Sequence, residues 1–348
     1  MIGFGKGGKT LAKALASKGE SVLVVEKSTR MYGGTCINIG CIPSKSLIFN
    51  GERGIDFTEA VARKEKLTGM LRAKNYHMIS DEATGTVMDG TARYANHEKF
   101  QLKKVINASG RMTILGVSTL SETVLDAQRF GGQHFFEMEE LSIQTGKYLA
   151  DLLEVEDVQI VSSASAGIAQ SVAAVIGKGE LYPLYHPYAE SIKKRQIILP
   201  KGHNVDYGTA VEIMVQQGGG QVVEAGYANM CTPEQIEMMI TEETAGILYI
   251  KSHHTVQKSM LDVSEAAQIA KKHQLPLIVD AAAEEDLKKY VQLGADLVIY
   301  SGAKAIEGPS AGMVIGKKTY VSWVRMQSKG IGRSMICRLP IYLSCLRL

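Results

Sequence analysis

Two side chains of opposite charge follow successive apolar runs in the second half of the chain. Asp280 ends the run at 277–280, and Lys304 follows the next run in the order Ser301-Gly302-Ala303-Lys304. Because the carboxyl ends of neighbouring parallel strands line one crevice, both side chains are predicted to point at the same place. A Schiff-base lysine and a carboxylate that keeps a pyridine nitrogen protonated are the pair that pyridoxal phosphate (PLP) chemistry needs. Taken singly, each residue is also typical of an ordinary turn.

A serine-rich turn could hold the phosphate of such a cofactor. Residues 162–167 lie between a predicted strand and a predicted helix, where free backbone N–H groups bind anions. This predicts Ser163, Ala164 and Ser165 as phosphate contacts. Ser301, three residues before the lysine, is a further candidate.

Histidine and arginine side chains supply the remaining candidates of this site. His253 or His254 could stack on the cofactor ring, and an exposed histidine is the alternative interpretation. Arg111 and His203 are predicted to contact substrate. Arg333 is flanked by glycines and suits a sugar phosphate, because a guanidinium binds phosphate through two hydrogen bonds. A helix end rich in basic residues explains Arg333 equally well.

The first residues of the chain hold a different motif. Gly3, Gly5 and Gly8 form G-x-G-x-x-G, in which glycines make the turn, admit a pyrophosphate and let a helix pack closely. Glu26 ends the following strand, where an acid would hold a ribose hydroxyl. Together they predict a dinucleotide site, although only Met1 and Ile2 stand where the first strand should be.

Two cysteines lie close together in GGTCINIGCIPSK. Cys36 and Cys41 are predicted at a helix N-terminus, where they can form a small strained disulfide. The helix dipole would lower the pKa of the nearer thiol. Two buried structural thiols are the alternative. A metal site is disfavoured, because no further cysteine or histidine stands at ligand spacing.

Alternating apolar and helical patterns position these residues. In the first hundred residues we expect helices at 10–18 and 56–78, a strand at 21–26, and short strands and turns at 86–102. Seven strands and five helices alternate after residue 105, which predicts an open, mostly parallel sheet covered by helices. The strands are expected at 158–162, 196–199, 221–224, 246–250, 277–280, 296–300 and 313–315, and the helices at 166–176, 209–217, 233–240, 263–273 and 284–293.

Composition narrows the class of protein. The chain has 348 residues, 45% of them hydrophobic and 22% charged, which favours about two globular domains and excludes wholesale disorder. No membrane span or signal peptide is expected, so we expect a cytoplasmic protein without membrane partners. Residues 1–104 have a net charge of +7 and residues 105–328 of −8. The absence of a dense basic tract makes nucleic acid an unexpected partner, and five cysteines argue against a disulfide framework.

The cysteine motif and the glycine loop resemble the flavoprotein disulfide reductases, relatives of dihydrolipoamide dehydrogenase and mercuric reductase. The likeness covers residues 1–102 and implies a Rossmann-like fragment that binds FAD. Cys41 would then face the flavin, Cys36 would exchange with substrate, and Lys45 would lie near flavin N5. The FAD contacts implied by the resemblance are Gly3, Gly5, Gly8, Glu26, Gly34, Thr35 and Lys45. The family's NAD(P)H and dimerisation domains have no counterpart in this sequence.

Residues 103–335 resemble the selenocysteine-synthase-related branch of fold-type-I PLP enzymes, with the D-glucosaminate-6-phosphate ammonia-lyases as the nearest members. The likeness rests on VINASGRMTILG, VSSASAGIA, LPLIVDAAAEEDL and LVIYSGAKAIEGPSAGMVIGKK. It implies an aspartate-aminotransferase-like domain with Lys304 as Schiff-base lysine, Asp280 as pyridine partner, and Ser163, Ser165 and Ser301 as phosphate contacts. It also implies a homo-oligomer, since such sites usually lie at subunit interfaces.

The sequence therefore predicts two enzyme segments joined near residues 102–104, followed by an unassigned tail at 336–348. The main functional hypothesis is a PLP-dependent lyase that removes the α-proton of a phosphorylated amino-sugar acid, expels water and releases ammonia. The alternative is an FAD-dependent disulfide oxidoreductase that uses Cys36 and Cys41. A second alternative is a protein related to selenium transferases that binds tRNA, which the negative charge of residues 105–328 disfavours.

Overall fold

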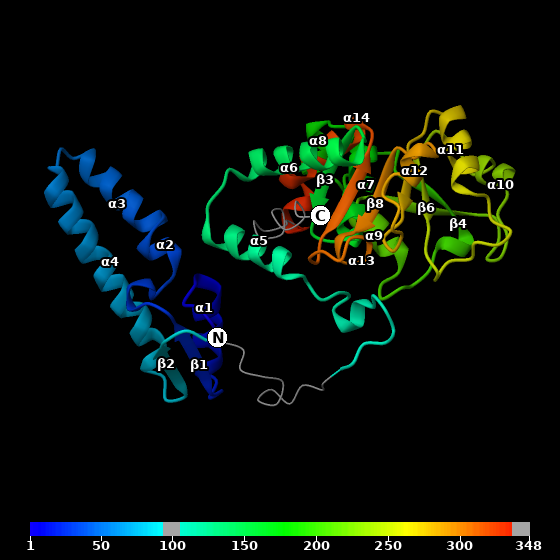
Figure 1. Cartoon of the computed structure of the whole chain (residues 1–348). Helices are drawn as coiled ribbons and strands as arrows, with labels where there is room; N and C mark the ends of the chain where they lie inside the picture. Colours follow the sequence, from blue (N-terminus) through cyan, green and yellow to red (C-terminus); the bar gives the residue numbers. More distant parts are fainter. Residues whose placement is uncertain (93–104, 336–348) are drawn as a thin grey trace. The chain divides into compact units, whose positions relative to one another are not determined.

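The computed structural model describes residues 1–92 and 105–335, and the predicted tail at 336–348 lies outside them, as do residues 93–102. The chain divides into two compact units, residues 1–106 and 107–348 (Figure 1). Each unit has its own sheet and its own buried core.

The first unit is built around two parallel strands, β1 (Val22–Glu26) and β2 (Gly85–Asp89). Ile2 forms a single parallel bridge with Val25. The strand expected before the glycine loop is therefore reduced to this one pair of residues. The predicted strand at 21–26 and the long helix at 56–78 are confirmed as β1 and α4, and Asp56 caps α4 by accepting two backbone N–H bonds. The helices of this unit are α1 (Lys6–Ala16), α2 (Thr35–Asn38), α3 (Cys41–Gly51) and α4 (Phe57–Ser80).

The second unit contains a seven-stranded sheet in the order β3-β9-β8-β7-β6-β4-β5. All seven predicted strands are present, and the sheet is mostly parallel as expected. Only β9 runs antiparallel to its neighbours β3 and β8. The strands are β3 (Asp157–Val161), β4 (Gln196–Pro200), β5 (Gln221–Ala225), β6 (Thr244–Ile250), β7 (Leu277–Asp280), β8 (Leu297–Ser301) and β9 (Gly312–Gly316).

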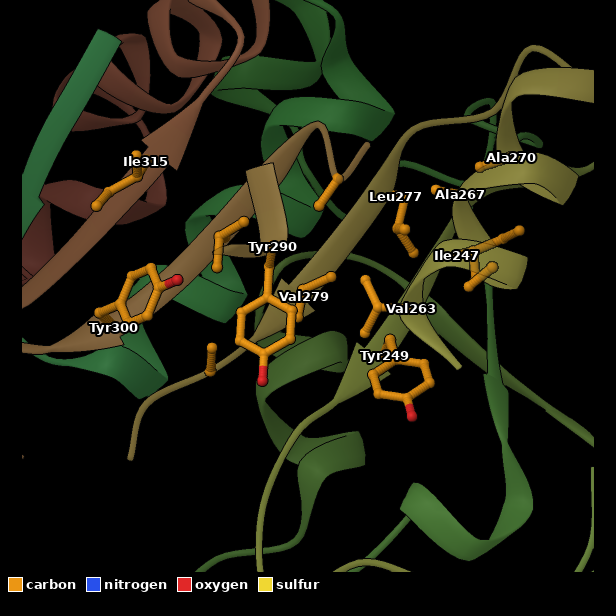
Figure 2. Packing of buried hydrophobic residues seen from close by; sticks show 14 of the residues in the cluster. Ile247, Tyr249, Val263, Ala267, Ala270, Leu277, Val279, Tyr290, Tyr300 and Ile315 are labelled. Atoms are coloured by element: carbon orange, nitrogen blue, oxygen red, sulfur yellow. The ribbon is translucent and has the colours of Figure 1, made fainter. Parts of the chain in front are cut away.

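Helices cover both faces of this sheet. One core cluster joins α6, α10, α11 and α12 to one face, and Figure 2 shows its members Tyr249, Leu277 and Tyr300 from three strands. A second cluster joins α7, α9 and α14 to the other face. The helices are α5 (Glu122–Gln133), α6 (Met138–Leu153), α7 (Ala164–Gly177), α8 (Leu181–Tyr185), α9 (Val211–Gln217), α10 (Pro233–Glu237), α11 (Val263–Lys272), α12 (Lys289–Gln292), α13 (Gly302–Ala305) and α14 (Lys318–Met326).

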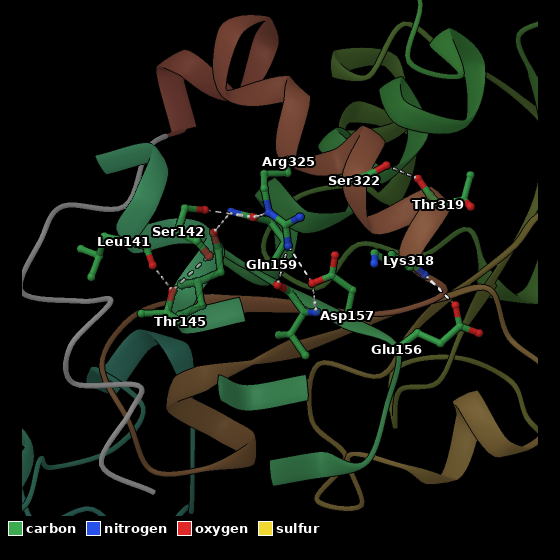
Figure 3. Close-up of polar contacts among 12 residues, drawn as sticks. Leu141, Ser142, Thr145, Glu156, Asp157, Gln159, Lys318, Thr319, Ser322 and Arg325 are labelled. Atoms are coloured by element: carbon green, nitrogen blue, oxygen red, sulfur yellow. Dashed lines mark hydrogen bonds and ion pairs between the residues drawn. The ribbon is translucent and has the colours of Figure 1, made fainter. Parts of the chain in front are cut away.

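Two helical predictions need correction. The pattern at 284–293 forms only the short helix α12, because Tyr290 is buried while the preceding residues form turns held by side chains such as Asp286. Helices α5 and α6 were not predicted. A buried polar network fixes α6 and α14 to the edge strand β3: Arg325 donates to Asp157 and Gln159, and Ser142 also donates to Gln159 (Figure 3).

Candidate active site

The carboxyl ends of β7 and β8 lie side by side and carry the predicted acid and amine. Asp280 is the last residue of β7 and pairs with Ile299 of β8. Lys304 lies on α13, which starts directly after β8, and Ser301 caps this helix by accepting the Lys304 backbone N–H. Adjacent strands thus bring the two residues to one edge of the sheet.

Asp280 is buried, with 4% of its surface exposed, and both of its carboxylate oxygens accept hydrogen bonds. Oδ1 accepts the Ala282 backbone N–H at 3.1 Å, and Oδ2 accepts the Tyr207 hydroxyl at 3.2 Å. Burial raises the pKa of Asp280 to about 6, against the two hydrogen bonds and the positive charge of Lys304, which lower it. Within the described residues the Lys304 ammonium itself has no hydrogen bond or ion pair, so its nitrogen is free to react.

Two predicted phosphate contacts lie on the strands that flank β9: Ser163 follows β3, and Ser301 ends β8. Because β9 is antiparallel, its first residue Gly312 lies beside Val161 of β3 and Ser301 of β8. A Cβ at Gly312 would lie 2.4 Å from the Ser163 carbonyl oxygen, so the turn that starts α7 closes on this strand. The Ser163 hydroxyl caps α7 by accepting the Ala166 N–H at 3.0 Å, and Ala164 and Ser165 form the first helical turn.

These groups fit PLP. A buried carboxylate, a free amine within its electrostatic reach and a helix N-terminus all stand at the carboxyl edge of one sheet. The cofactor's ring nitrogen, carbonyl carbon and phosphate would find these three groups in turn.

The structure adds a residue that the sequence analysis missed. Tyr207 follows β4 and η3 (Lys201–His203) in a tight turn, in which Gly208 has a φ of +114°. Its ring lies 6.3 Å from that of His254, and the ring centroids of His253 and His254 are 4.0 Å apart with the planes tilted by 38°. Both histidines are exposed. No motif marks Tyr207, because its partner Asp280 lies 73 residues away in the sequence.

Arg111 lies beside the backbone of Lys304. Its guanidinium donates to the Lys304 carbonyl oxygen and forms ion pairs with Glu285 at 3.1 Å and Glu307 at 2.8 Å. Ser118 of the same segment donates to the Ala303 carbonyl at 2.7 Å. The segment before α5 is thereby fixed to the helix that carries the lysine, and Arg111 reaches substrate only if it exchanges these partners.

His203 and Arg333 take positions that differ from the expected substrate contacts. His203 is fully buried: its Nε2 donates to the Val256 carbonyl at 3.1 Å and its Nδ1 accepts the Ile250 N–H. Burial lowers the pKa of His203 to about 4, so the ring is neutral at pH 7. Arg333 is exposed on η5 (Ile331–Met335), which packs near Gln170 in the middle of α7 and not at the Ser163 end.

The glycine loop of the first unit has open space beside it. Gly3 has a φ of +86°, and a Cβ at Gly3 or Gly5 would meet no atom within 4 Å. Gly8 lies on α1 against the Gly3 carbonyl, as close helix packing requires. The Glu26 carboxylate accepts the Phe4 N–H at 2.8 Å and so supports the loop. This loop fits the pyrophosphate of FAD.

The two cysteines face each other across the junction of α2 and α3. Cys36 lies within α2 and Cys41 begins α3, and both are exposed and unbridged. A hydrogen bond with Cys41 raises the pKa of Cys36, whereas the charges of Lys6 and Lys45 lower it. Lys45 is one turn beyond Cys41 on α3. Thr35 begins α2, and a Cβ at Gly34 would lie 2.8 Å from the Gly5 Cα, so the cysteine loop packs against the glycine loop.

Other features of the structure lie away from these two sites. A cavity of about 630 Å³ lies at the other end of the strands of the large sheet, where β8 begins and β9 ends. Its lining includes Asp296, Lys317 and Tyr320. In the described ranges, no three His, Cys, Asp or Glu side chains are placed to hold a metal ion. No helix within these ranges is long and apolar enough to cross a membrane.

Comparison with known proteins gives two different likenesses. The family model described as L-seryl-tRNA selenium transferase matches residues 105–341. D-glucosaminate-6-phosphate ammonia lyase of Salmonella typhimurium (strain 14028s) is 45% identical over 69% of this chain, which spans 65% of that relative's length. A solved D-glucosaminate-6-phosphate ammonia-lyase structure superposes with a TM-score of 0.70 at 43% identity, over 72% of this chain and 68% of its own.

Residues 1–166 match a different family model, described as pyridine nucleotide-disulphide oxidoreductase. The "Probable pyridine nucleotide-disulfide oxidoreductase RclA" of Escherichia coli (strain K12) is 41% identical over 36% of this chain and 29% of its own length. The family match extends past residue 106 into segments that the structure places in the second unit, including β3. The predicted combination of the two segments is thus confirmed.

Proposed function

This chain belongs to the L-seryl-tRNA selenium transferase family through residues 105–341, and we propose that it is a PLP-dependent lyase acting on a phosphorylated amino-sugar acid. One observation carries the proposal: Asp280 and Lys304, from adjacent strands, lie within electrostatic reach of each other at one sheet edge. The 45% identity to D-glucosaminate-6-phosphate ammonia lyase supports the choice of substrate class.

Each side chain then has a task. PLP, when bound, supplies an electron-accepting ring for the α-carbon of an amine substrate. Asp280 would hold the proton at the ring nitrogen, and Lys304 would hold the carbonyl carbon and would be the base that accepts the α-proton at its Nζ. The first turn of α7, with Ser163, Ala164 and Ser165, and Ser301 at the start of α13, bind the phosphate. His253 stacks on the ring from the end of β6.

Reduction with borohydride tests the cofactor assignment. The chain incubated with PLP and reduced is expected to carry one pyridoxyl group on Lys304, located by peptide mass spectrometry. Lys304→Ala should abolish the adduct completely, whereas Lys288→Ala, at a surface lysine paired with Glu154, should retain it. An adduct on other lysines but not on Lys304 would overturn the assignment.

Ammonia release tests the reaction. We expect ammonia and a keto product from D-glucosaminate-6-phosphate, and at least about tenfold less from the unphosphorylated acid, because a phosphate held by charge-assisted hydrogen bonds contributes more than about 1.4 kcal/mol. Equal rates with both acids would contradict the proposed recognition of the substrate phosphate. A chain that carries the Lys304 adduct but releases no ammonia would contradict the lyase activity alone.

A second candidate function belongs to the first unit. The hydrogen-bonded pair Cys36 and Cys41, next to a glycine loop with open space, favours an FAD-dependent disulfide oxidoreductase site. Flavin bound by this unit would be yellow and would become fluorescent on release. Flavin retention that disappears in Gly5→Ala and persists in Lys304→Ala would support this candidate, and the absence of any flavin binding would contradict it.

A further inference from the structure

The Tyr207 hydroxyl reaches Asp280 from the far side of β6. Tyr207 follows β4, and the sheet order β7-β6-β4 places β6 between β4 and Asp280 on β7. The turn is held by a bridge between Asp206 and Ala210 and by a hydrogen bond from the Gly208 N–H to Asp206. The backbone therefore presents the phenol to the carboxylate, rather than leaving it as a surface side chain.

The groups around Asp280 show why this contact matters. Lys304 contributes positive charge from α13, and the Ala282 N–H donates to Oδ1 from the following turn. The backbone of Lys251, after β6, donates to the Asp280 carbonyl and not to its side chain. His254 lies against Tyr207. Tyr207 is thus the side chain that donates a hydrogen bond to this buried carboxylate among the described residues.

We propose that Tyr207 is a positioning residue whose hydroxyl keeps Asp280 ionised and aims its carboxylate at the ring nitrogen of the cofactor. The inference rests on the proposed function of this site. Both oxygens are held, Oδ1 by Ala282 and Oδ2 by Tyr207, and each keeps a second lone pair. A carboxylate fixed in this way can accept the ring N–H without first reorienting, and burial without the phenol would favour the neutral acid.

A purely structural role is the competing explanation. The Tyr207 hydroxyl lies 3.9 Å from the Met214 sulfur, and the Tyr207 side chain packs against the core cluster that includes Val211 and Met214 of α9. Replacement by phenylalanine keeps that packing and removes only the hydroxyl. A packing role predicts an unchanged cofactor affinity for this variant.

The test measures PLP affinity of the full chain between pH 5 and 8.5 by absorbance titration. Tyr207→Phe is expected to weaken binding about tenfold at pH 7, the loss expected for one hydrogen bond to a charged group. The pH below which PLP affinity falls should move upward by about one unit, because Asp280 then protonates more easily. The matched control is Tyr290→Phe, which removes another buried phenol that donates to a carboxylate, Glu284 at 2.6 Å, and should bind PLP like the wild type.

A double-mutant cycle separates the outcomes. In an Asp280→Asn background, Tyr207→Phe should have no further effect on PLP affinity, and additive losses would overturn the proposal. Wild-type affinity and pH midpoint in Tyr207→Phe would also overturn it. If this variant does not fold, Tyr207→Gln replaces the phenol with an amide donor: a wild-type pH midpoint supports the proposal, and a midpoint raised despite the donor contradicts it. Failure of the wild-type chain to bind PLP would instead contradict the proposed function.

Discussion

The two units position their predicted phosphate sites by opposite means. In the second unit the site turn closes on Gly312, where a Cβ would lie within 3 Å of the backbone of Ser163 and Ala164. In the first unit the glycine loop faces open space at Gly3 and Gly5. The large sheet is covered on both faces, whereas the first unit relies on two strands and a small core around Phe4 and Ile79. Two-stranded sheets gain their stability from the helices that pack on them. Backbone packing thus defines the proposed PLP site, whereas the proposed dinucleotide site is defined by the open space beside its glycines.

Two glycine substitutions test this difference between the sites, and one of them has the largest effect that we expect. Gly312→Ala forces backbone apart at the edge of the sheet, so we expect a loss of about 3 kcal/mol in unfolding free energy and loss of PLP binding. Urea unfolding followed by fluorescence measures it, since the single tryptophan, Trp323, lies on α14 of the second unit.

The counterpart is Gly5→Ala. Gly5 has a φ of −65°, which alanine adopts without strain, so the first unit should keep or gain up to about 1 kcal/mol. Limited proteolysis of the first unit gives the measurement. Equal destabilisation by the two substitutions would contradict the difference drawn between the two sites.

The second prediction concerns the loss in unfolding free energy that follows from burying the Asp280 carboxylate. The pKa of Asp280 rises from its ordinary 3.8 to about 6 on folding. Its contribution to stability is therefore fully present below about pH 4 and is lost as the pH rises through 6. Asp280→Asn removes this loss, so the variant without PLP should be more stable by about 3 kcal/mol at pH 7 and equal to the wild type near pH 4. PLP affinity should fall at the same time.

Asp296→Asn is the matched control for that prediction. Asp296 is also buried, but it forms an ion pair with Lys317 at 2.7 Å and accepts the Leu277 N–H. Its replacement leaves an amine without its partner and should destabilise the chain. Destabilisation by Asp280→Asn at pH 7 would show that Asp280 serves the fold and not the site.

The sequence predicted the strands better than the contacts between their loops. Seven apolar runs located seven strands, because burial on both sheet faces leaves an unbroken apolar signal. The adjacency of Asp280 and Lys304 followed from chain order in a parallel sheet. The role of Tyr207 could not be predicted, because its side chain reaches Asp280 across β6 and no local sequence pattern marks such a contact. The burial of His203 could not be predicted for the same reason: its partners Ile250 and Val256 lie about 50 residues further on.

The smallest expected effect concerns Cys36 and Cys41, and it tests whether the candidate site of the first unit contains two interacting thiols. Cys36 is exposed, and its hydrogen bond with Cys41 is the main cause that raises its pKa, whereas Lys6 and Lys45 act in the opposite direction. In reduced Cys41→Ala the lysine charges remain and the raising partner is gone. The thiolate fraction of Cys36 at pH 7.5 should therefore grow, and its alkylation should become several-fold faster.

Peptide mass spectrometry after timed alkylation measures Cys36 alone. The difference between variant and wild type should vanish at alkaline pH, where Cys36 is fully ionised in both chains. Cys231 provides an internal standard, because burial raises its pKa to about 11 and keeps it slow in both chains. An unchanged rate at pH 7.5 would mean that the two thiols do not interact. The first unit would then keep an open glycine loop without a coupled thiol pair beside it, and the oxidoreductase candidate would lose the observation that favours it.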